Sequence, residues 1–191
     1  MFTSIFRKIV RGRSEEVARR ISSYIKQTDK IIDIGSGSGD VSLVLQSQGM
    51  NTTPVDVGDF HGPRLIKTII YDGKKLPFKD QSFNKALLLM VMHHTPNPEL
   101  IFREATRVAK EIVVIETSYA TSFAKIHTVI TDAIGNLRLE AFWNSYKTDQ
   151  EWRKIFNING FKVVDSHKYH DRNIGLPFLH ISYYLKRKSN A

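Results

Sequence analysis

One stretch of sequence decides the fold of this chain: Ile31-Ile32-Asp33-Ile34-Gly35-Ser36-Gly37-Ser38-Gly39-Asp40. Its first four residues are mostly apolar and β-branched, which predicts a buried parallel strand. Three alternating glycines follow, and helical spacing then runs from Val41 to Gln48. A strand, a glycine-rich turn and a helix suit a polar ligand, because glycines allow close backbone approach and a helix N-terminus offers unpaired N–H groups.

The rest of the chain alternates between short apolar strands and helical patterns. Further strands are predicted at 53–57, 67–72, 85–90 and 111–116, with a last antiparallel pair at 161–167 and 179–186. Helices are predicted at 98–110, 121–137 and 148–157. The pattern indicates the α/β class: a Rossmann-like three-layer α/β/α sandwich, with a mostly parallel seven-stranded sheet and an antiparallel strand near the C-terminus. Ligands of such sheets bind beyond the carboxyl ends of the strands.

The first 30 residues form a segment of their own. Phe2, Ile5, Phe6, Ile9 and Val10 follow helical spacing and are interleaved with arginines. Gly12 is expected to interrupt this helix, and Ser14 to cap a second one. We expect residues 1–30 to form amphipathic helices that fold over the ligand as a lid or cap. The alternative is that they lie on an anionic membrane surface.

Composition narrows the class of protein. The 191 residues suit one α/β domain. The chain has no cysteine, which excludes disulfides and thiolate sites and fits a reducing, cytoplasmic setting. Of the net charge of +9, residues 1–30 carry +5 and residues 161–191 carry +4, while residues 31–160 balance at 14 against 14. The basic ends indicate either an anionic partner, such as a membrane, a nucleic acid or an acidic substrate, or solubility alone.

The glycine spacing excludes two common nucleotide sites. A dinucleotide loop has the pattern G-x-G-x-x-G, whereas Gly35, Gly37 and Gly39 give G-x-G-x-G. Asp40 then stands at the sixth position, where its charge would repel a pyrophosphate. No Gly-Lys-Ser/Thr follows, so the loop is not a phosphate-binding P-loop either.

The same loop resembles the first motif of class I S-adenosylmethionine-dependent methyltransferases, of the methyltransferase type 11 or ubiquinone-biosynthesis-like kind. The order of later motifs strengthens the resemblance, which covers residues 17–187. One departure is Asn84, where the family usually has a structural aspartate after Phe83. The motifs that match are Val55-Asp56-Val57, Asp72-Gly73, Leu76-Pro77-Phe78, Ser82-Phe83, Val91-Met92-His93-His94-Thr95-Pro96, Arg103-Glu104, Arg107-Val108, Trp152 and Gly160-Phe161.

The resemblance implies a cofactor site for S-adenosylmethionine, with S-adenosylhomocysteine as product, in a methyltransferase domain at residues 31–191. Asp56 would accept hydrogen bonds from the ribose hydroxyls. Asp72 would accept one from the adenine amino group, unless it only shapes an Asp-Gly turn. Asp33 would support the loop, with the loop N–H groups as its expected partners. The other implied cofactor contacts are Gly35, Ser36, Gly37, Gly39, Val57, Gly73 and the carbonyl of Leu89.

His94 is the predicted catalytic residue, as a neutral base in the loop that faces the methyl group in enzymes of this family. Glu116 either orients a substrate amine or bonds to the backbone. Phe142, Trp143 and Tyr146 either line the acceptor pocket or belong to the core. No metal site is predicted, because the remaining histidines form no ligand pattern.

The acceptor is expected to be a small molecule or a lipid-like or quinone-like compound. The alternatives are an RNA or protein methyltransferase and a non-catalytic cofactor-binding interaction protein. Fold alone does not choose among them.

Overall fold

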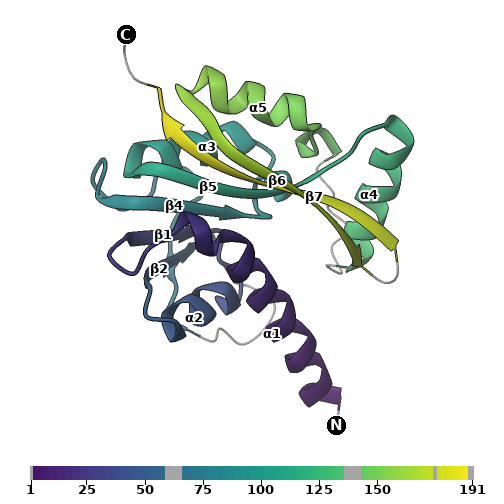
Figure 1. The fold of residues 1–191 in the computed structure, drawn as a ribbon, viewed down its shortest axis with the longest axis horizontal. Helices are drawn as coiled ribbons and strands as arrows, with labels where there is room; N and C mark the ends of the chain where they lie inside the picture. The colour runs from purple at the N-terminus through teal and green to yellow at the C-terminus, as the bar shows by residue number, and fades with distance from the viewer. Residues whose placement is uncertain (1, 59–65, 136–142, 174–175, 189–191) are drawn as a thin grey trace.

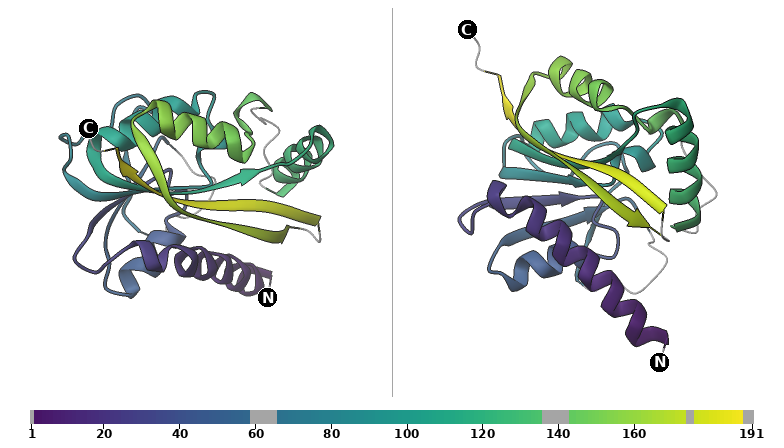
Figure 2. Two further views of the ribbon diagram at one scale, coloured as in Figure 1. Left: turned by 45° about the horizontal axis from the view of Figure 1, so that its top comes forward. Right: turned by 45° about the vertical axis from the view of Figure 1, so that its right-hand side comes forward.

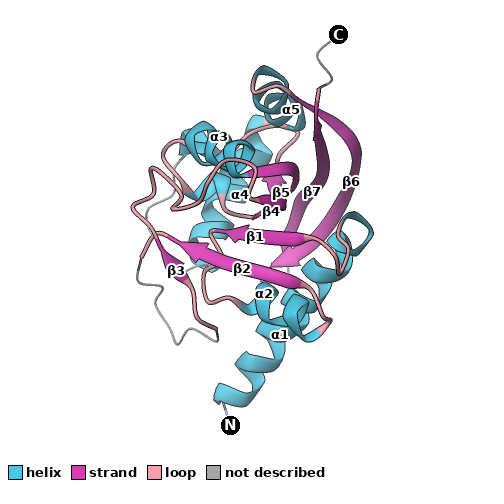
Figure 3. Cartoon of the chain, turned by 90° about the vertical axis from the view of Figure 1, so that its left-hand side faces the viewer, coloured by secondary structure: helices cyan, strands magenta, loops and turns pink. Residues whose placement is uncertain are grey.

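The structure is a computed structural model that describes residues 2–58, 66–135, 143–173 and 176–188 (Figure 1). Its seven strands form one sheet in the order β3-β2-β1-β4-β5-β7-β6 (Figure 3). Parallel pairing joins the first five strands in that order, and β7 pairs antiparallel with both β5 and β6, which confirms the predicted fold class. The strands are β1 (Lys30–Ile34), β2 (Asn51–Asp56), β3 (Ile69–Ile70), β4 (Phe83–Leu89), β5 (Ala109–Ser118), β6 (Phe161–Asn173) and β7 (Leu176–Arg187).

Helices cover both faces of the sheet (Figure 2). One face carries α1 (Phe2–Ile21) and α2 (Asp40–Ser47), and the other carries α3 (Pro98–Val108) and α5 (Asp149–Ile158). The remaining α-helix, α4 (Ser122–Gly135), follows β5 in the chain. Strand residues alternate between two cores: Ile31 packs with α1 and α2, whereas Ile32 packs with α3 and α5. This is why the strands are apolar almost throughout.

The predicted break at Gly12 is wrong, because α1 runs through it as one helix of 20 residues. A helical glycine costs only about 1 kcal/mol relative to alanine. The turns after Gly12 are held by tertiary packing, since Val17, Ala18 and Ile21 are each at most 4% exposed. The apolar side chains predicted for the first turns lie outside the side chains that the structure describes. Among the described residues, no helix is both long and apolar enough to cross a membrane.

The last two strands are longer than predicted and form a hairpin that outruns the sheet. Pairing between β5 and β7 ends at Ser118 and Leu179, while β6 and β7 remain paired to Asn173 and Leu176. The free part of the hairpin therefore extends past the carboxyl end of β5, above α1 (Figure 1). Here it borders the region where the parallel strands end.

The family departure at Asn84 has a structural explanation. Its side-chain Oδ1 accepts a 2.8 Å hydrogen bond from the backbone N–H of Lys30, at the start of β1. An amide oxygen makes this bond as a carboxylate does. The substitution therefore leaves the pairing of β1 and β4 intact, far from the carboxyl ends of the strands.

Candidate active site

The glycine loop after β1 takes a backbone conformation that suits glycine. Gly35, Gly37 and Gly39 all have positive φ angles, of 76°, 56° and 86°. The loop turns back on β2, where the carbonyl of Val55 accepts hydrogen bonds from the N–H groups of Gly35 and Ser36. A side chain on Gly35 would also collide with Val91, which lies after β4. Two neighbouring strand ends thus pack directly on each other at this loop.

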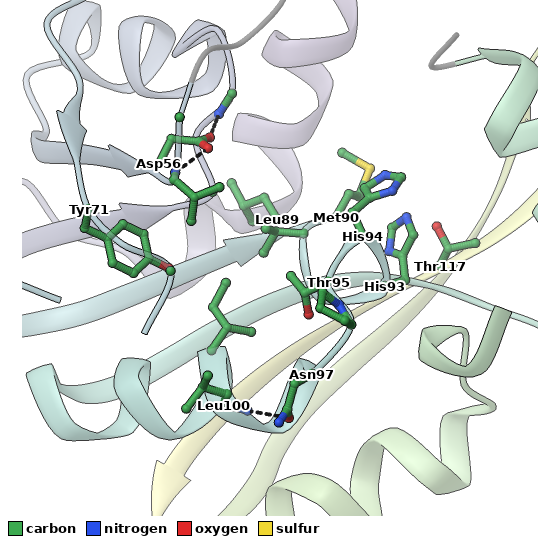
Figure 4. Close-up of a pocket in the computed structure, with 18 of the residues that line it drawn as sticks. Asp56, Tyr71, Leu89, Met90, His93, His94, Thr95, Asn97, Leu100 and Thr117 are labelled. Carbon is green, nitrogen blue, oxygen red and sulfur yellow. Dashed lines mark hydrogen bonds between the residues drawn. The ribbon is translucent and has the colours of Figure 1, made fainter. Parts of the chain in front are cut away.

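Asp56 ends β2 beside the loop, as the sequence predicted. Its Oδ2 accepts a 2.6 Å hydrogen bond from the Gly37 N–H, and its Oδ1 accepts one of 2.7 Å from the Val57 N–H (Figure 4). A carboxylate offers about four acceptor positions, so both oxygens keep a lone pair for a ligand. Asp56 therefore shapes the loop and still presents acceptors to the space in front of it.

Asp33 lies beneath the loop and is 2% exposed. Its expected partners were the loop N–H groups, and this prediction is wrong: the N–H groups of Gly35 and Ser36 bond to Val55, and Oδ2 of Asp33 accepts a 2.7 Å bond from the Ser42 hydroxyl. Burial raises the pKa of Asp33 to about 6, against the opposing effect of the Ser42 bond. Asp33 thus ties the end of β1 to α2 through the Ser42 side chain.

The turn after β4 is held by a buried carboxylate. Met90 has a positive φ of 56°, unusual for a residue with a side chain. Glu116, which is 0% exposed, accepts hydrogen bonds from the N–H groups of Val91 and Met92 and pairs with Nδ1 of His93. Of the two roles predicted for Glu116, the structure therefore shows the backbone-bonding one. It also shows a histidine partner that the sequence did not reveal.

The segment after β3 is held by α3. Glu104 accepts a 2.7 Å bond from the Leu76 N–H, and Arg107 donates bonds to the carbonyls of Leu76 and Phe78. This explains physically why Leu76-Pro77-Phe78 and the Glu104/Arg107 pair occur together in the sequence.

A cavity of about 690 Å³ lies beyond the carboxyl ends of the strands (Figure 4). We call one part the glycine end, lined by Gly35, Gly37, Asp56, Val57, Gly58, Tyr71 and Gly73. The other part, the histidine end, is lined by Arg13, Met90, His93, His94, Thr117 and His180. Leu89, Val91, Thr95, Pro96, Asn97, Leu100 and Ile101 complete the wall. The volume is within the range of about 300–1,000 Å³ that is typical of small-ligand sites.

Seven of the predicted site residues line this cavity: Gly35, Gly37, Asp56, Val57, Gly73, Leu89 and His94. The other four, Asp33, Ser36, Gly39 and Asp72, are not in the wall. Gly39 packs against Ile66, which leaves no room for a side chain. Asp72 is exposed, and its Oδ1 accepts bonds from the N–H groups of Lys74 and Lys75, so it shapes the Asp-Gly turn. These backbone bonds hold the pKa of Asp72 below its usual value.

The aromatic stretch predicted after α4 does not line the cavity where the structure describes it. Tyr146 is 2% exposed and packs on the ring of His93 with centroids 5.0 Å apart. Trp143 is 44% exposed, and Phe142 lies outside the described residues. Tyr146 therefore has the core role of the two that the sequence left open.

Sequence reasoning missed several residues of the wall. Tyr71 lines the glycine end, and burial, with the nearby charge of Asp56, raises its pKa to about 12, so it stays a neutral hydrogen-bond donor. Arg13, Thr117 and His180 come from α1, β5 and β7. A signal existed only for Tyr71, which directly precedes the Asp72-Gly73 motif.

The residues of the glycine end fit S-adenosylmethionine. Backbone atoms of Gly35 and Gly37 line the cavity, and Asp56 offers carboxylate lone pairs suited to ribose hydroxyls. Ser36 Oγ is buried and has no hydrogen-bond partner within the described part of the chain. Ser36 lies behind the cavity wall, so the fit rests on Gly35, Gly37 and Asp56.

Comparison with known proteins agrees with this fit. Residues 6–166 match the family model described as a methyltransferase domain. A demethylmenaquinone methyltransferase from Streptomyces avermitilis is 29% identical over 127 residues, which are 61% of this chain and 53% of that protein. The chain thus spans about half the length of the curated relatives that it matches.

Solved structures share the fold. A methyltransferase from Methanosarcina mazei has a TM-score of 0.69 at 19% identity, covering 87% of this chain and 96% of its own. The magnesium protoporphyrin IX methyltransferase of Synechocystis, solved with S-adenosylhomocysteine bound, has a TM-score of 0.63 at 14% identity, covering 93% and 83%. The chain therefore belongs to the methyltransferase-domain family, and it has the fold of class I S-adenosylmethionine-dependent methyltransferases.

Proposed function

We propose that this enzyme methylates a small, quinone-like acceptor that binds at the histidine end of the cavity. The observation that carries the proposal is that one cavity joins the glycine end to a cluster of three histidines and an arginine. The relative named as a demethylmenaquinone methyltransferase supports a small-molecule acceptor of this kind. A chain without cysteines suits the reducing cytoplasm, where we expect the reaction to occur.

The proposed cofactor contacts lie at the carboxyl ends of β1, β2 and β4. Asp56 accepts from the ribose hydroxyls, and Val57 packs on the adenine, as its 59% exposure allows. The backbone of Gly35 and Gly37 lies along the carboxypropyl chain, and the Leu89 carbonyl takes the ammonium group. Ser36, Gly39 and Asp33 act from behind the loop, and Gly73 lies near the ring, with Asp72 as the acid of the turn. When bound, S-adenosylmethionine supplies an activated methyl group on a sulfonium.

We propose that His94, in the turn that follows β4, is a proton acceptor of the reaction. Its ring lies against that of His93, with centroids 4.1 Å apart, and His93 is fixed by Glu116. We propose that this ring contact positions His94 at the cavity wall, as a base requires. We also propose that residues 1–30 act as a cap, since Arg13 of α1 lines the same cavity.

Isothermal titration calorimetry tests the cofactor site. Asp56→Ala should weaken binding of S-adenosylhomocysteine by about tenfold or more, because charge-assisted hydrogen bonds are worth about 1.5–3 kcal/mol each. Asp56→Asn, which keeps one acceptor oxygen, should lose less. Asp80→Ala is the matched control, since Asp80 is an exposed acid that pairs with Arg107 away from the cavity. Equal affinity in wild type and Asp56→Ala would overturn the assignment.

Mass spectrometry then tests the acceptor. The wild type, with S-adenosylmethionine, should add one methyl group to a reduced naphthoquinone. Cofactor binding without transfer to any of a panel of phenols, quinols and amines would favour the non-catalytic interaction protein instead.

A further inference from the structure

A second histidine–carboxylate pair faces the cavity from the C-terminal hairpin. His180, on β7, is 9% exposed and lines the histidine end. Its Nδ1 lies 2.6 Å from Oδ2 of Asp171, which stands on β6. A carboxylate cannot donate, so Nδ1 carries the proton. Asp171 therefore accepts the hydrogen bond from Nδ1–H, and Nε2 is the ring nitrogen that can bind a ligand in the cavity.

The Asp171 carboxylate is itself fixed by α1. Arg20 donates two hydrogen bonds to it, of 2.6 and 2.5 Å, from a side chain that is only 9% exposed. Such a two-point contact sets the plane of the carboxylate as well as its position. The guanidinium of Arg20 also lies 4.2 Å from the centroid of the Tyr169 ring on β6. The His180 ring is thus oriented through Asp171 by the first helix of the chain.

The same helix brings a second cation to the cavity. Arg13 lies one turn before Val17, on the face of α1 that meets the sheet, and it lines the histidine end. Its Nη2 lies 3.7 Å from Sδ of Met90, which is a weak acceptor and leaves most of the guanidinium donors for other contacts. Met90 is the residue with the positive φ, so Arg13 lies over the turn that follows β4.

Strand register places His180 and Arg13 on the same side. His180 stands opposite Thr117 on β5, and both line the cavity. Residues paired across strands share a face, and Val113 and Ile115, four and two residues before Thr117, pack against α1. The histidine end therefore lies between the hairpin and α1.

The charges of the cavity are separated between its two ends. The acid among its described lining residues is Asp56, at the glycine end. Arg13, His93, His94 and His180 stand at the histidine end. Burial lowers the pKa of His180, and the charges of Arg13 and His93 act in the same direction, against the effect of Asp171. His180 is therefore neutral near pH 7, with a lone pair on Nε2.

We infer that Arg13 and His180 bind the acceptor through a weakly acidic hydroxyl group, of the phenol or enol kind. This inference rests on the proposed function and names the chemical group that the histidine end recognises. The hydroxyl donates to Nε2 of His180, and its oxygen lies beside the Arg13 guanidinium. A carboxylate would find no donor on a neutral His180, and a cationic amine would be repelled by Arg13.

The pair also provides a route for the hydroxyl proton, so in this proposal His180 takes that proton and His94 is left for the proton that the methylated atom loses. The O–H bond of the acceptor breaks, the proton forms an N–H bond at Nε2 of His180, and the electron pair stays on oxygen as an anion beside Arg13. Asp171 stabilises the resulting imidazolium, because its carboxylate already holds Nδ1–H. The acceptor is thereby made more nucleophilic before it meets the cofactor.

Visible absorption of a bound nitrophenol tests this inference without turnover. 4-Nitrophenol is coloured only as the anion, so its spectrum reports where the proton is. In the wild-type protein, saturated with S-adenosylhomocysteine, the pKa of bound nitrophenol should be about one unit lower than that of the free phenol. This shift corresponds to about 1.4 kcal/mol in favour of the phenolate. Calorimetry on the same samples measures cofactor binding.

Two variants separate the deprotonation of the probe from its binding affinity. His180→Gln should bind the probe in its neutral form, and Arg13→Gln should weaken probe binding by about tenfold, the loss of about 1.4 kcal/mol. His167→Gln and Arg19→Gln are the matched controls, because these residues lie on β6 and α1, are exposed and do not line the cavity. Both should behave as wild type, and all four variants should bind S-adenosylhomocysteine normally.

The outcomes separate this inference from the proposed function. If wild type binds S-adenosylhomocysteine but holds nitrophenol in the neutral form, or does not bind it, the inference is wrong and the cofactor site stands. If Arg13→Gln and His180→Gln match the wild-type spectrum and affinity, the inference is equally wrong. Failure of wild type to bind S-adenosylhomocysteine would instead overturn the proposed function.

Discussion

The α-carbon of Gly35 faces the side chain of Val91 so closely that a Cβ on Gly35 would lie 2.8 Å from the Cβ of Val91. Gly35 also has a φ of 76°, which a residue with a side chain rarely adopts. The loop after β1 and the turn after β4 therefore constrain each other, and the glycine end depends on both.

Gly35→Ala should consequently disrupt the glycine end. We expect cofactor affinity to fall by about a hundredfold or more and the free energy of unfolding to fall by about 1–3 kcal/mol, from strain and overpacking. The double variant Gly35→Ala/Val91→Ala removes only the contact with the γ-methyl groups and should recover only part of this loss, since the Cβ at position 91 still lies 2.8 Å away and the positive φ remains. Calorimetry and urea unfolding measure the two effects. Full recovery in the double variant would show that contact with the γ-methyl groups of Val91 is the sole reason for glycine at this position.

Glu116 should be essential for the turn after β4. Glu116→Ala removes the acceptor of the Val91 and Met92 N–H groups and of His93, all in a buried setting. Each unsatisfied donor costs about 1–3 kcal/mol, so we expect the free energy of unfolding to fall by about 3–5 kcal/mol. Glu116→Gln keeps an acceptor oxygen for the backbone and should lose less. The expected order in urea unfolding is wild type, then Gln, then Ala, and equal stability of Gln and Ala would contradict it.

Asp33 should make the folded protein less stable as the pH rises, which is the opposite of the usual effect of a carboxyl group. Its pKa rises from 3.8 in the unfolded chain to about 6 in the folded one, so the folded state binds the proton more tightly. Its contribution to the free energy of unfolding therefore falls as the pH rises from about 4 to about 6, and the loss is complete above pH 6. Two pKa units correspond to about 3 kcal/mol.

Asp33→Asn isolates this contribution. Asparagine can still accept the Ser42 bond but does not titrate, so the difference in unfolding free energy between variant and wild type should grow in favour of the variant between pH 4 and 6. Thermal unfolding across this range, without cofactor, measures it. Ser42→Ala, which removes the bond that lowers the pKa of Asp33, should steepen the dependence. Parallel curves for wild type and Asp33→Asn would refute the prediction.

Arg20 should control the protonation of His180 from a distance. Arg20 bonds to Asp171 and lowers the pKa of that carboxyl well below its ordinary value. In Arg20→Gln the carboxylate loses its cation and attracts a proton on His180 more strongly, so the pKa of His180 should rise. Histidine NMR titration measures this shift. Arg19→Gln changes the neighbouring residue, which pairs with Glu16, and should leave the His180 titration unchanged.

Much of the fold and of the glycine end could be predicted because their signals are local. The run from Ile31 to Asp40 contains its own strand, turn and helix start, and Asp56 follows one strand later. The continuity of α1 was missed because the packing of Val17 and Ile21 outweighs the local preference of Gly12.

The part of the histidine end that His180 and Arg13 supply was missed for a different reason. His180 and Asp171 are nine residues apart on two strands, and the hydrogen bond between them depends on the hairpin register. Their link to Arg20 joins positions 151 residues apart. Spacing along the sequence carries no signal for contacts made by strand register and by helix docking.

The ion pair between Arg20 and Asp171 ties the beginning of the chain to its end, and it does so beside the cavity. The middle of the chain supplies Gly35, Asp56 and Gly73, whereas the two ends supply Arg13 and His180. Under the proposed roles, substitutions in α1 and in the C-terminal hairpin should therefore change how the acceptor binds and leave the cofactor contacts of Gly35, Asp56 and Gly73 in place.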